Sequence, residues 1–370
     1  MKKILFVHSS AELYGSDRSL LNIVKYLDKK TIQIFVILPC HGPLEEQMQQ
    51  VPNVYVEISQ LAVLRRKNLS VRGSIEYINS FRKSYRYLKL FIQEKKIDAV
   101  YTNTSVIFPG AVAAKHTGIG SVWHVREIMK NRMENIVISK MISHYADVVI
   151  ANSRETAKAL KIPQNKIRVI YNAVEEKENA QIVPHDRLTV GMAGRINRWK
   201  GQKLFVDAAE QVHREFPEAV FKLAGCAYTG EEYLEKELRE YIHSKGLQNV
   251  VTLCGQIEDM DSFYSSLDVF VLPSIHPEPF GLVIIEAMEY GLPVIATNHG
   301  GPTEIIQDGV DGYLVDHLSC EEMACRIMEL LKDEKMRRDM GINAQQKKRN
   351  MFCVRNMAQC IEEVLYNVLE

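Results

Sequence analysis

The stretch PSIHPEPFGLVIIEAMEYGLPVIATNHGGPTE, residues 273–304, contains the pattern that decides the fold. Its apolar run Leu282–Met288 predicts a helix from Gly281 onward, and Pro293–Thr297 predicts the strand that follows. Short apolar runs of the same kind recur along both halves of the chain, at 3–8, 32–38, 53–58, 97–101, 121–125, 147–151, 167–171, 188–193, 219–224, 249–254, 269–272 and 313–315. Strands that alternate with helices predict an α/β fold with open parallel sheets that are covered on both faces.

Two carboxylates flank the expected start of the helix after Gly281. Glu278 lies in the loop ahead of it, and Glu286 lies about one turn into it. Between them, the backbone amides of residues 280–283 would point outward at the positive end of the helix dipole, which suits a phosphate. With an acid on either side to bind hydroxyl groups, we expect a site for a sugar joined to a phosphate. The alternative, a helix-start acid and a surface acid, explains Glu286 less well because Glu286 interrupts an apolar face.

The bulk composition is that of an ordinary globular protein. A length of 370 residues suggests two domains, and 46% apolar with 25% charged residues is a usual composition. No apolar run approaches the ~18 residues of a membrane helix, and Ile4–Val7 is too short for the apolar core of a signal peptide. The seven cysteines include no Cys-x-x-Cys pair, which argues for a reducing cytoplasm and against disulfides or a structural zinc.

The net charge of zero is the sum of two halves of opposite sign. Residues 1–175 contain 26 Lys and Arg against 14 Asp and Glu, a net charge of +12, and the remainder has a net charge of −12. The polar segment 175–187 contains Pro184 and shows no periodic apolar pattern, so it marks the boundary. We therefore predict domains at 1–175 and 176–350, with a C-terminal helix over 351–370 that packs back on the first domain.

The loop Gly194–Gly201, GRINRWKG, directly follows a predicted strand and places cations beside glycines. Arg195 can bind a diphosphate bidentately, and Lys200 can bind it as a point charge. Open α/β sheets bind ligands at the carboxyl ends of their strands, where this loop is expected. Alone it would be interpreted as a solvated basic loop, but together with residues 273–304 it indicates a diphosphate site.

Two further polar features have competing interpretations. His124 ends a predicted strand, so it is either a structural histidine or part of a site at the carboxyl edge of the sheet, and both interpretations stay open. Asp259 and Asp261 resemble an Asp-x-Asp metal motif, but they precede an expected helix start, where acids are usual. We interpret them as a capping turn and predict no metal site.

The helix expected from Val71 onward is markedly basic. Its apolar positions recur at steps of three and four as far as Ile92, and residues 65–96 include ten Lys or Arg against two Glu. A charge run is usually a solvated face. Because an apolar stripe and several tyrosines accompany this one, it also fits an interfacial helix. Contact with an anionic membrane surface through residues 65–96 is therefore one of two open interpretations.

These motifs resemble those of family 4 glycosyltransferases, enzymes of the GT-B fold, over nearly the whole chain. EPFGLVIIEAM at 278–288 looks like the family's Glu-x7-Glu motif, and GLPVIA at 291–296 and Gly300–Gly301 follow it with matching spacing. In the first half, GSDRSLL at 15–21 resembles the family's glycine loop, although a Gly-Gly pair is more usual there. The resemblance implies two Rossmann-like, doubly wound parallel-sheet domains that face a cleft.

The resemblance also implies roles for single residues. The catalytic residues would be His124 near the transferred sugar, Arg195 and Lys200 on the donor diphosphate, and Glu278 on the sugar hydroxyls. The donor nucleotide would further contact Gly194, Gly255, Gln256, Ile257, Phe280, Gly281, Leu282, Val283 and Glu286, with residues 255–257 near the base and Glu286 at the ribose. The acceptor side would be lined by Gly15, Ser16 and Asp17.

The implied function is that of a retaining glycosyltransferase that needs no metal and no cofactor. It would move a sugar from UDP or GDP to a lipid-linked or polysaccharide acceptor in cell-surface polysaccharide biosynthesis, in the cytoplasm or peripherally at the inner face of the membrane. A nucleotide-sugar epimerase and a non-catalytic sugar-nucleotide-binding protein remain as alternatives. Paired acids also serve glycosidases, but phosphate-binding donors fit transfer better than hydrolysis. No Gly-x-Gly-x-x-Gly fingerprint supports a dehydrogenase, and we expect no nucleic-acid partner.

Overall fold

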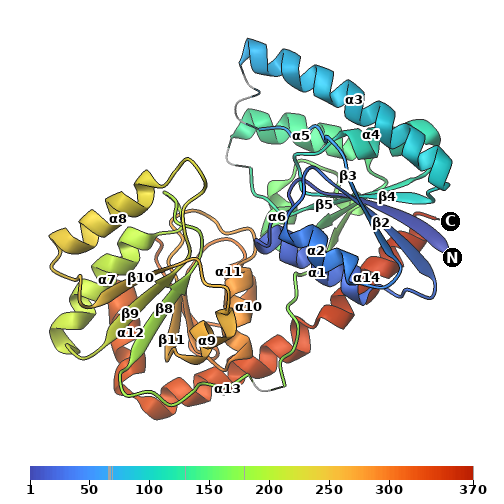
Figure 1. Ribbon diagram of the computed structural model, residues 1–370. Coiled ribbons are helices and arrows are strands. Elements are labelled where there is room, and N and C mark those ends of the chain that lie inside the picture. Colours follow the sequence, from blue (N-terminus) through green and yellow to red (C-terminus); the bar gives the residue numbers. More distant parts are fainter. Residues whose placement is uncertain (66–67, 69, 130, 179, 370) are drawn as a thin grey trace. The chain divides into compact units, whose positions relative to one another are not determined.

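The computed structural model describes residues 1–65, 68, 70–129, 131–178 and 180–369. The chain forms two compact units (Figure 1). Unit 1 comprises Met1–Glu175 and Val354–Glu370, and unit 2 comprises Glu176–Cys353. Each unit has its own parallel sheet and its own apolar core.

The sheet of unit 1 has seven strands in the order β3-β2-β1-β4-β5-β6-β7. Its central strands are short apolar runs that are buried on both faces, as parallel strands between two helix layers are. The strands are β1 (Lys2–Val7), β2 (Ile32–Leu38), β3 (Val54–Ile58), β4 (Ala99–Asn103), β5 (Gly120–Val125), β6 (Val148–Ala151) and β7 (Ile167–Val169).

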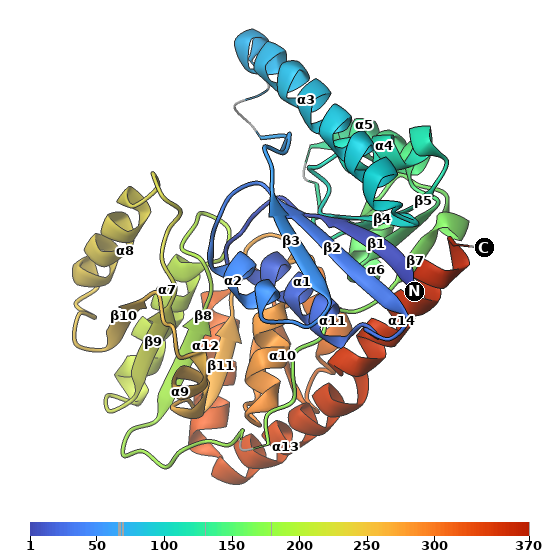
Figure 2. The ribbon, with the colours of Figure 1, turned by 45° about the vertical axis from the view of Figure 1, so that its right-hand side comes forward.

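Helices cover both faces of this sheet. One face packs against the first two helices and the last helix of the chain, which Figure 2 shows beside the sheet, and the other packs against α3 to α6. The helices are α1 (Gly15–Tyr26), α2 (Pro43–Gln49), α3 (Val71–Lys95), α4 (Pro109–Thr117), α5 (Arg132–Tyr145), α6 (Arg154–Ala159), the 3₁₀ turn η2 (Gln164–Lys166) and α14 (Val354–Asn367). The C-terminal helix thus belongs to the same compact unit as the N-terminal half.

The sheet of unit 2 has six strands in the order β10-β9-β8-β11-β12-β13. Its strands are β8 (Thr189–Ala193), β9 (Val220–Ala224), β10 (Val251–Gly255), β11 (Val269–Leu272), β12 (Val294–Thr297) and β13 (Gly312–Val315). Its helices are α7 (Gln202–Glu215), α8 (Tyr233–Ser244), α9 (Met260–Ser265), α10 (Leu282–Glu289), α11 (Pro302–Ile305), α12 (Cys320–Lys332) and α13 (Glu334–Met351). Helices α7, α8 and α12 flank this sheet (Figure 1), and their apolar side chains share one core with it.

Every predicted strand is present, and the ends differ from the prediction by at most two residues. The long basic helix is also present as α3, but its apolar stripe is only partly buried. Leu88 and Ile92 lie in the core, whereas Val71, Ile75 and Ile78 are 83%, 58% and 49% exposed. Residues 66–67 and 69 of the predicted membrane segment 65–96 lie outside the described residues.

No helix in the described part of the chain is both long and apolar enough to cross a bilayer.

Strand order fixes where each unit can bind a ligand. In unit 1 the order reverses between β1 and β4, and in unit 2 it reverses between β8 and β11. In open α/β sheets, ligands bind beyond the carboxyl ends of the strands at such a reversal. The sites of interest are therefore the segments that follow β1 and β4 in unit 1, and those that follow β8 and β11 in unit 2.

Candidate functional site

Glycines allow the backbone to turn sharply at the carboxyl edge of the unit 2 sheet. Gly194, which follows β8, has a φ of 156°, and Gly201, which ends the same loop, has a φ of 77°. A Cβ atom at Gly201 would lie 1.7 Å from the carbonyl oxygen of Pro273, which follows β11. The amide of Ile275 donates to the carbonyl of Trp199 at 2.9 Å. The loop after β8 and the loop after β11 are therefore in direct backbone contact.

This contact brings Lys200 and Glu278 together. The Nζ atom of Lys200 lies 2.6 Å from Oε2 of Glu278, and the two side chains are 13% and 10% exposed. The hydroxyl of Ser274 donates to the same carboxylate oxygen at 3.0 Å. Both contacts use Oε2. Lys200 and Ser274 therefore hold the carboxylate group in place, and neither of them forms a hydrogen bond with the other oxygen, Oε1. The sequence predicted both residues for one site, and the structure pairs them.

The Gly300–Gly301 segment fixes the backbone of Glu278. Glu278 and Gly300 form a parallel bridge, and the amide of Gly301 donates to the carbonyl of Glu278 at 2.7 Å. A Cβ atom at Gly300 would lie 2.4 Å from that carbonyl oxygen, so only glycine permits this approach. The two motifs of residues 273–304 therefore form one structure around Glu278.

Ser274 is itself held by two side chains, one from the last residue of β12 and one from the segment that follows it. The hydroxyl of Thr297 and Nε2 of His299 both lie 2.7 Å from the carbonyl oxygen of Ser274. Because a carbonyl only accepts, His299 carries its proton on Nε2. Burial lowers the pKa of His299 below its ordinary value, which favours this neutral form.

Helix α10 begins directly after Gly281, whose φ of 104° places it in the left-handed region. The first amides of a helix have no acceptor within the helix, so those of Leu282 and Val283 are not used by hydrogen bonds inside α10. One turn later, Oε2 of Glu286 accepts a hydrogen bond from the hydroxyl of Tyr264 at 2.8 Å. Tyr264 is buried, so Glu286 is anchored to the body of the unit.

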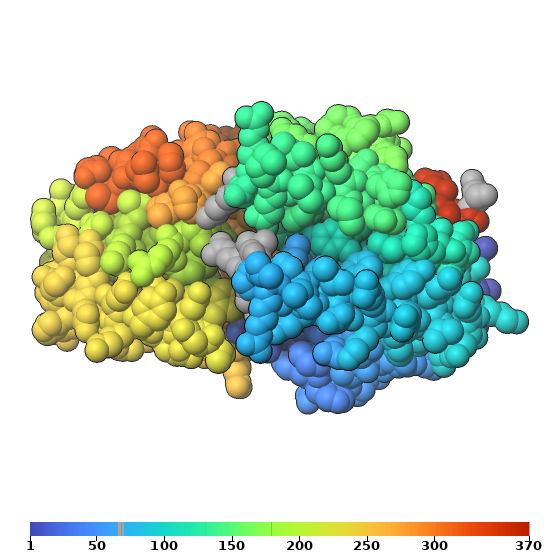
Figure 3. All heavy atoms as spheres, turned by 90° about the horizontal axis from the view of Figure 1, so that it is seen from above, coloured from blue at the N-terminus to red at the C-terminus, as the bar shows by residue number. Residues whose placement is uncertain are grey.

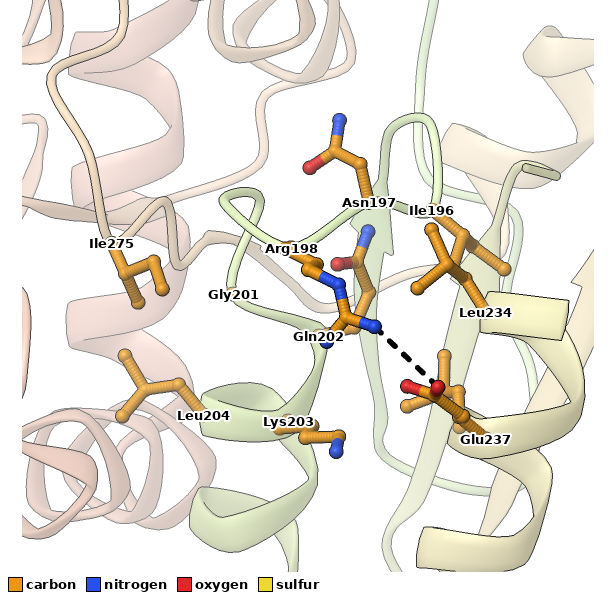
Figure 4. A pocket seen from close by; sticks show the side chains of 11 residues that line it. Ile196, Asn197, Arg198, Gly201, Gln202, Lys203, Leu204, Leu234, Glu237 and Ile275 are labelled. Carbon is orange, nitrogen blue, oxygen red and sulfur yellow. Dashed lines mark hydrogen bonds and ion pairs between the residues drawn. The ribbon is translucent and has the colours of Figure 1, made fainter. Parts of the chain in front are cut away.

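The two arginines of the loop after β8 have different partners. The guanidinium of Arg195 stacks on the ring of Tyr228 at 3.4 Å, and its carbonyl accepts from the side chain of Gln202 at 2.9 Å. Arg198 instead lies 3.5 Å from Glu237 of α8, at a pocket of about 210 Å³ between the loop, α7 and α8 (Figure 4). Arg195 stays the predicted diphosphate ligand. Arg198 forms an ion pair with Glu237 and not with Glu278.

The residues predicted near the base lie at the end of β10. Gly255 is its last residue, with a φ of 66°, and its carbonyl accepts from the amide of Gly225 at 2.7 Å. Gln256 and Ile257 follow, and Oε1 of Gln256 accepts from the thiol of Cys226 at 3.3 Å. Since β10, β9 and β8 are neighbours, these residues share the carboxyl edge with Gly194.

The predicted residues of unit 1 lie at the carboxyl edge of its own sheet. Gly15, Ser16 and Asp17 form the first turn of α1. Asp17 is buried, and its two oxygens accept from the amide of Tyr14 at 2.9 Å and contact Nε2 of His8 at 2.6 Å. Asp17 therefore organises the loop after β1, and acceptor binding by Gly15, Ser16 and Asp17 stays a prediction.

His124 is wholly buried near the end of β5. Its Nδ1 atom lies 2.5 Å from the hydroxyl of Tyr101 and 3.1 Å from Nη2 of Arg126. Its Nε2 atom has no hydrogen-bond partner among the described residues. Burial, together with the positive charge of Arg126, holds the pKa of His124 well below its ordinary value. The ring is therefore neutral, and a ligand-binding role for His124 stays a prediction.

Sequence reasoning missed the residues that support these groups. They are His8, Ser19, Tyr101, Asn103, Arg126 and Asn172 in unit 1, and Tyr228, Tyr264, Ser274, Thr297 and His299 in unit 2. Among them, His8 and Asn103 could have been found from the sequence. His8 ends a predicted apolar strand and Asn103 lies just beyond another, and polar residues in such positions gather at one edge of a parallel sheet.

Asp259 caps α9, as predicted. Its carboxylate accepts from the amides of Asp261 and Ser262, both at 3.1 Å. Within the described ranges, no group of three or more His, Cys, Asp or Glu could hold a metal ion. The two aspartates are therefore part of a helix start.

Two family models match the chain in succession. Residues 14–178 match the model of Glycosyltransferase Family 4, and residues 173–347 match that of Glycosyl transferases group 1. The chain belongs to family 4 of the glycosyltransferases. The predicted GT-B fold, two parallel-sheet α/β domains, is confirmed by the structures that this glycosyltransferase resembles.

Curated relatives match parts of the chain. The D-inositol 3-phosphate glycosyltransferase of Paenarthrobacter aurescens (strain TC1) is 36% identical over 160 residues, which are 42% of this chain and 38% of the relative. The lipopolysaccharide core biosynthesis mannosyltransferase LpsB of Rhizobium meliloti (strain 1021) is 29% identical over 221 residues, 57% of each chain. The matches thus span about half the length of these relatives.

A solved structure matches the whole chain. Anabaena Alr3699/HepE, solved in complex with UDP-glucose and also with UDP and glucose, has a TM-score of 0.84 and 27% sequence identity to this glycosyltransferase. The alignment covers 99% of this chain and 100% of that one.

Proposed function

We propose that this glycosyltransferase moves a sugar from a UDP- or GDP-linked donor to a hydroxyl group of a lipid-linked or polysaccharide acceptor, with retention of anomeric configuration and without a metal or cofactor. The observation that carries the proposal is the Lys200–Glu278 pair next to the start of α10. It places a cation, a carboxylate and helix amides at one sheet edge. The complexes of HepE with UDP-glucose support a UDP-linked donor.

The donor diphosphate would lie against Lys200, Arg195 and the first amides of α10. Negative charge grows on the diphosphate as it leaves, and fixed donors that are already oriented stabilise that charge more than water does. Oε1 of Glu278 would accept from a sugar hydroxyl, since the bonds from Lys200 and Ser274 both go to Oε2. Glu286, anchored by Tyr264, would accept from the ribose hydroxyls.

The reaction balances without a dedicated nucleophile. The bond between the anomeric carbon and the β-phosphate oxygen breaks, and its electron pair stays on the diphosphate. The acceptor oxygen bonds to the anomeric carbon on the same face, and its proton passes to the leaving phosphate oxygen. The transition state has oxocarbenium character, and the residues that hold the phosphate would keep the anomeric carbon and the acceptor oxygen at reacting distance.

A donor panel tests the proposal. Wild-type protein is mixed with UDP- and GDP-sugars, with and without lipid-linked saccharides or soluble glycans, and free UDP and GDP are measured together with the melting temperature. We expect one nucleotide class to raise the melting temperature, because a ligand that binds only the folded state stabilises it. Nucleotide release should then depend on the acceptor. Conversion of the sugar without an acceptor would indicate an epimerase, and binding without turnover a non-catalytic protein.

An exposed apolar and basic surface of unit 1 supports a membrane-bound acceptor. Val71, Ile75 and Ile78 of α3 are exposed, as are Met133 and Val137 of α5. Figure 3 looks onto the surface formed by α3, in blue, and α5, in green. Helix α3 also has six Lys or Arg against two Glu. Each cation near anionic lipid contributes ~1 kcal/mol, and inserted apolar side chains add to this.

Liposome flotation measures this contact. Wild-type protein should float with vesicles that contain anionic phosphatidylglycerol, and the Ile75→Asp, Ile78→Asp double variant should float at least several-fold less. Leu90→Asp is the matched control, because Leu90 is also exposed on α3 but lies off the stripe of Val71, Ile75 and Ile78. Equal flotation of wild-type protein with neutral and anionic vesicles would refute contact with an anionic membrane surface.

A further inference from the structure

Arg126 occupies an unusual position at the carboxyl edge of the unit 1 sheet. Its guanidinium is buried, with the residue 6% exposed. A buried charge is costly unless its hydrogen bonds are satisfied, and most buried arginines pair with a carboxylate. Among the described residues, the hydrogen bonds of this guanidinium go to neutral groups, and the carboxylates of Glu127 and Asp17 act on it through their charge alone. The neutral groups are Asn103 at 2.8 Å, Ser19 at 2.7 Å, Asn172 at 2.5 Å and His124 at 3.1 Å.

The hydrogen bond from Arg126 decides which nitrogen of His124 carries the proton. A guanidinium can only donate, so Nδ1 of His124 must accept. The proton of the neutral ring is then on Nε2, which is buried and has no partner among the described residues. His124 therefore presents a fixed N–H donor rather than an acceptor.

The hydroxyl of Tyr101 cannot impose this choice. It lies 2.5 Å from Nδ1 of His124, and a hydroxyl can either donate or accept. Burial raises the pKa of Tyr101, so the hydroxyl keeps its proton and both orientations are available to it. Tyr101 fits either tautomer of His124, whereas Arg126 fits only one.

Arg126 also orients a second histidine. Its Nε donates to Oδ1 of Asn103, which turns the Nδ2 amide of Asn103 toward Nδ1 of His8 at 2.9 Å. His8 must then donate through Nε2 to Asp17, at 2.6 Å. One guanidinium thus fixes the proton positions on both histidines at this edge, and through His8 it holds the first turn of α1.

We infer that Arg126 is a positioning residue, which fixes His124 as a neutral Nε2–H donor for an oxygen atom of the substrate. The consequence for catalysis rests on the proposed transfer reaction, but the proton position on His124 does not. Without Arg126, the hydrogen bond between His124 and Tyr101 can reverse its direction, so that Nδ1 donates to the hydroxyl. Nε2 then presents a lone pair to the substrate instead of a proton.

Nitrogen-15 NMR of the ligand-free protein tests the inference, because long-range proton–nitrogen spectra distinguish protonated from unprotonated ring nitrogens. The signals of His124 are assigned with His124→Gln. In wild-type protein and in Tyr101→Phe, His124 should be the Nε2–H tautomer from about pH 6 to about pH 8, where an ordinary histidine titrates. Arg126→Met should contain a substantial fraction of the Nδ1–H tautomer.

Kinetics separate positioning from a purely structural role. Arg126→Met should lower kcat by roughly a hundredfold, as loss of one oriented donor does, with the donor KM changed by no more than about twofold. Arg168→Met, which removes an exposed arginine of β7, should match wild-type protein. An Nδ1–H or titrating His124 in wild-type protein would overturn the inference even if Arg126→Met did not fold. A folded Arg126→Met variant with an unchanged His124 tautomer and an unchanged kcat would also overturn the inference. If the spectra are as expected but the protein transfers sugar from no donor, the result counts against the proposed function alone.

Discussion

Replacing Lys200 or Arg195 by Ala is expected to lower sugar transfer by roughly tens- to a thousand-fold. Each change removes one cation from the leaving diphosphate, and loss of a single charge-stabilising donor has effects of this order. Lys200→Ala also leaves Glu278, which is 7% exposed, without its cation. Breaking a buried pair in this way costs about 3–5 kcal/mol of folding free energy, so melting curves must accompany the rates.

Lys203→Ala is the matched control for both cations. Lys203 lies three residues beyond Lys200, but its Nζ atom lies over the ring of Tyr241 at 5.1 Å, beside the pocket of Figure 4. We expect it to keep wild-type transfer within about twofold, because exposed charges away from a site contribute little. Near-normal turnover of folded Lys200→Ala and Arg195→Ala would remove both residues from the mechanism.

Replacing Gly201 by Ala should abolish donor binding and destabilise unit 2 by on the order of 3 kcal/mol or more. The residue has a φ of 77°, which costs a non-glycine residue roughly 1–2 kcal/mol. The added Cβ would also lie 1.7 Å from the carbonyl oxygen of Pro273, so the loops after β8 and β11 must separate. Chemical denaturation and titration with UDP and GDP measure the two effects.

Gly246→Ala isolates the contribution of the left-handed conformation. Gly246 has a φ of 71°, and a Cβ atom there would meet nothing within 4 Å. This variant should lose only about 1 kcal/mol of stability and keep its affinity for the nucleotide. If Gly201→Ala were no worse than Gly246→Ala, the contact between the two loops would have no part in forming the site.

The fold of each unit could be predicted from the sequence because its strands are buried on both faces. Such strands read as short apolar runs, and runs such as Ile32–Leu38 and Val269–Leu272 coincide with strands to the residue. The turns after β8 and before α10 were also accessible to prediction, because Gly194, Gly201 and Gly281 mark the turns at which backbones approach one another. Sequence spacing could not show that Lys200 and Glu278 form an ion pair, since 78 residues separate them.

The polar network of unit 1 could not be predicted for a related reason. Asn172 and Ser19 are 153 positions apart, and only folding brings them together around Arg126. The role of His124 was ambiguous because the sequence around a histidine at a strand end does not show which residues will form hydrogen bonds with it. The exposed start of α3 was hidden as well, since the pattern that places Ile92 in the core continues unchanged to Ile75 at the surface.

A crystal structure with a bound UDP-sugar or GDP-sugar tests the central claim most directly. We expect the diphosphate oxygens within hydrogen-bonding distance of Arg195, Lys200 and the first amides of α10, and the ribose hydroxyls at Glu286. A bound nucleotide with the guanidinium of Arg195 and the ammonium of Lys200 directed away from the diphosphate would contradict the claim.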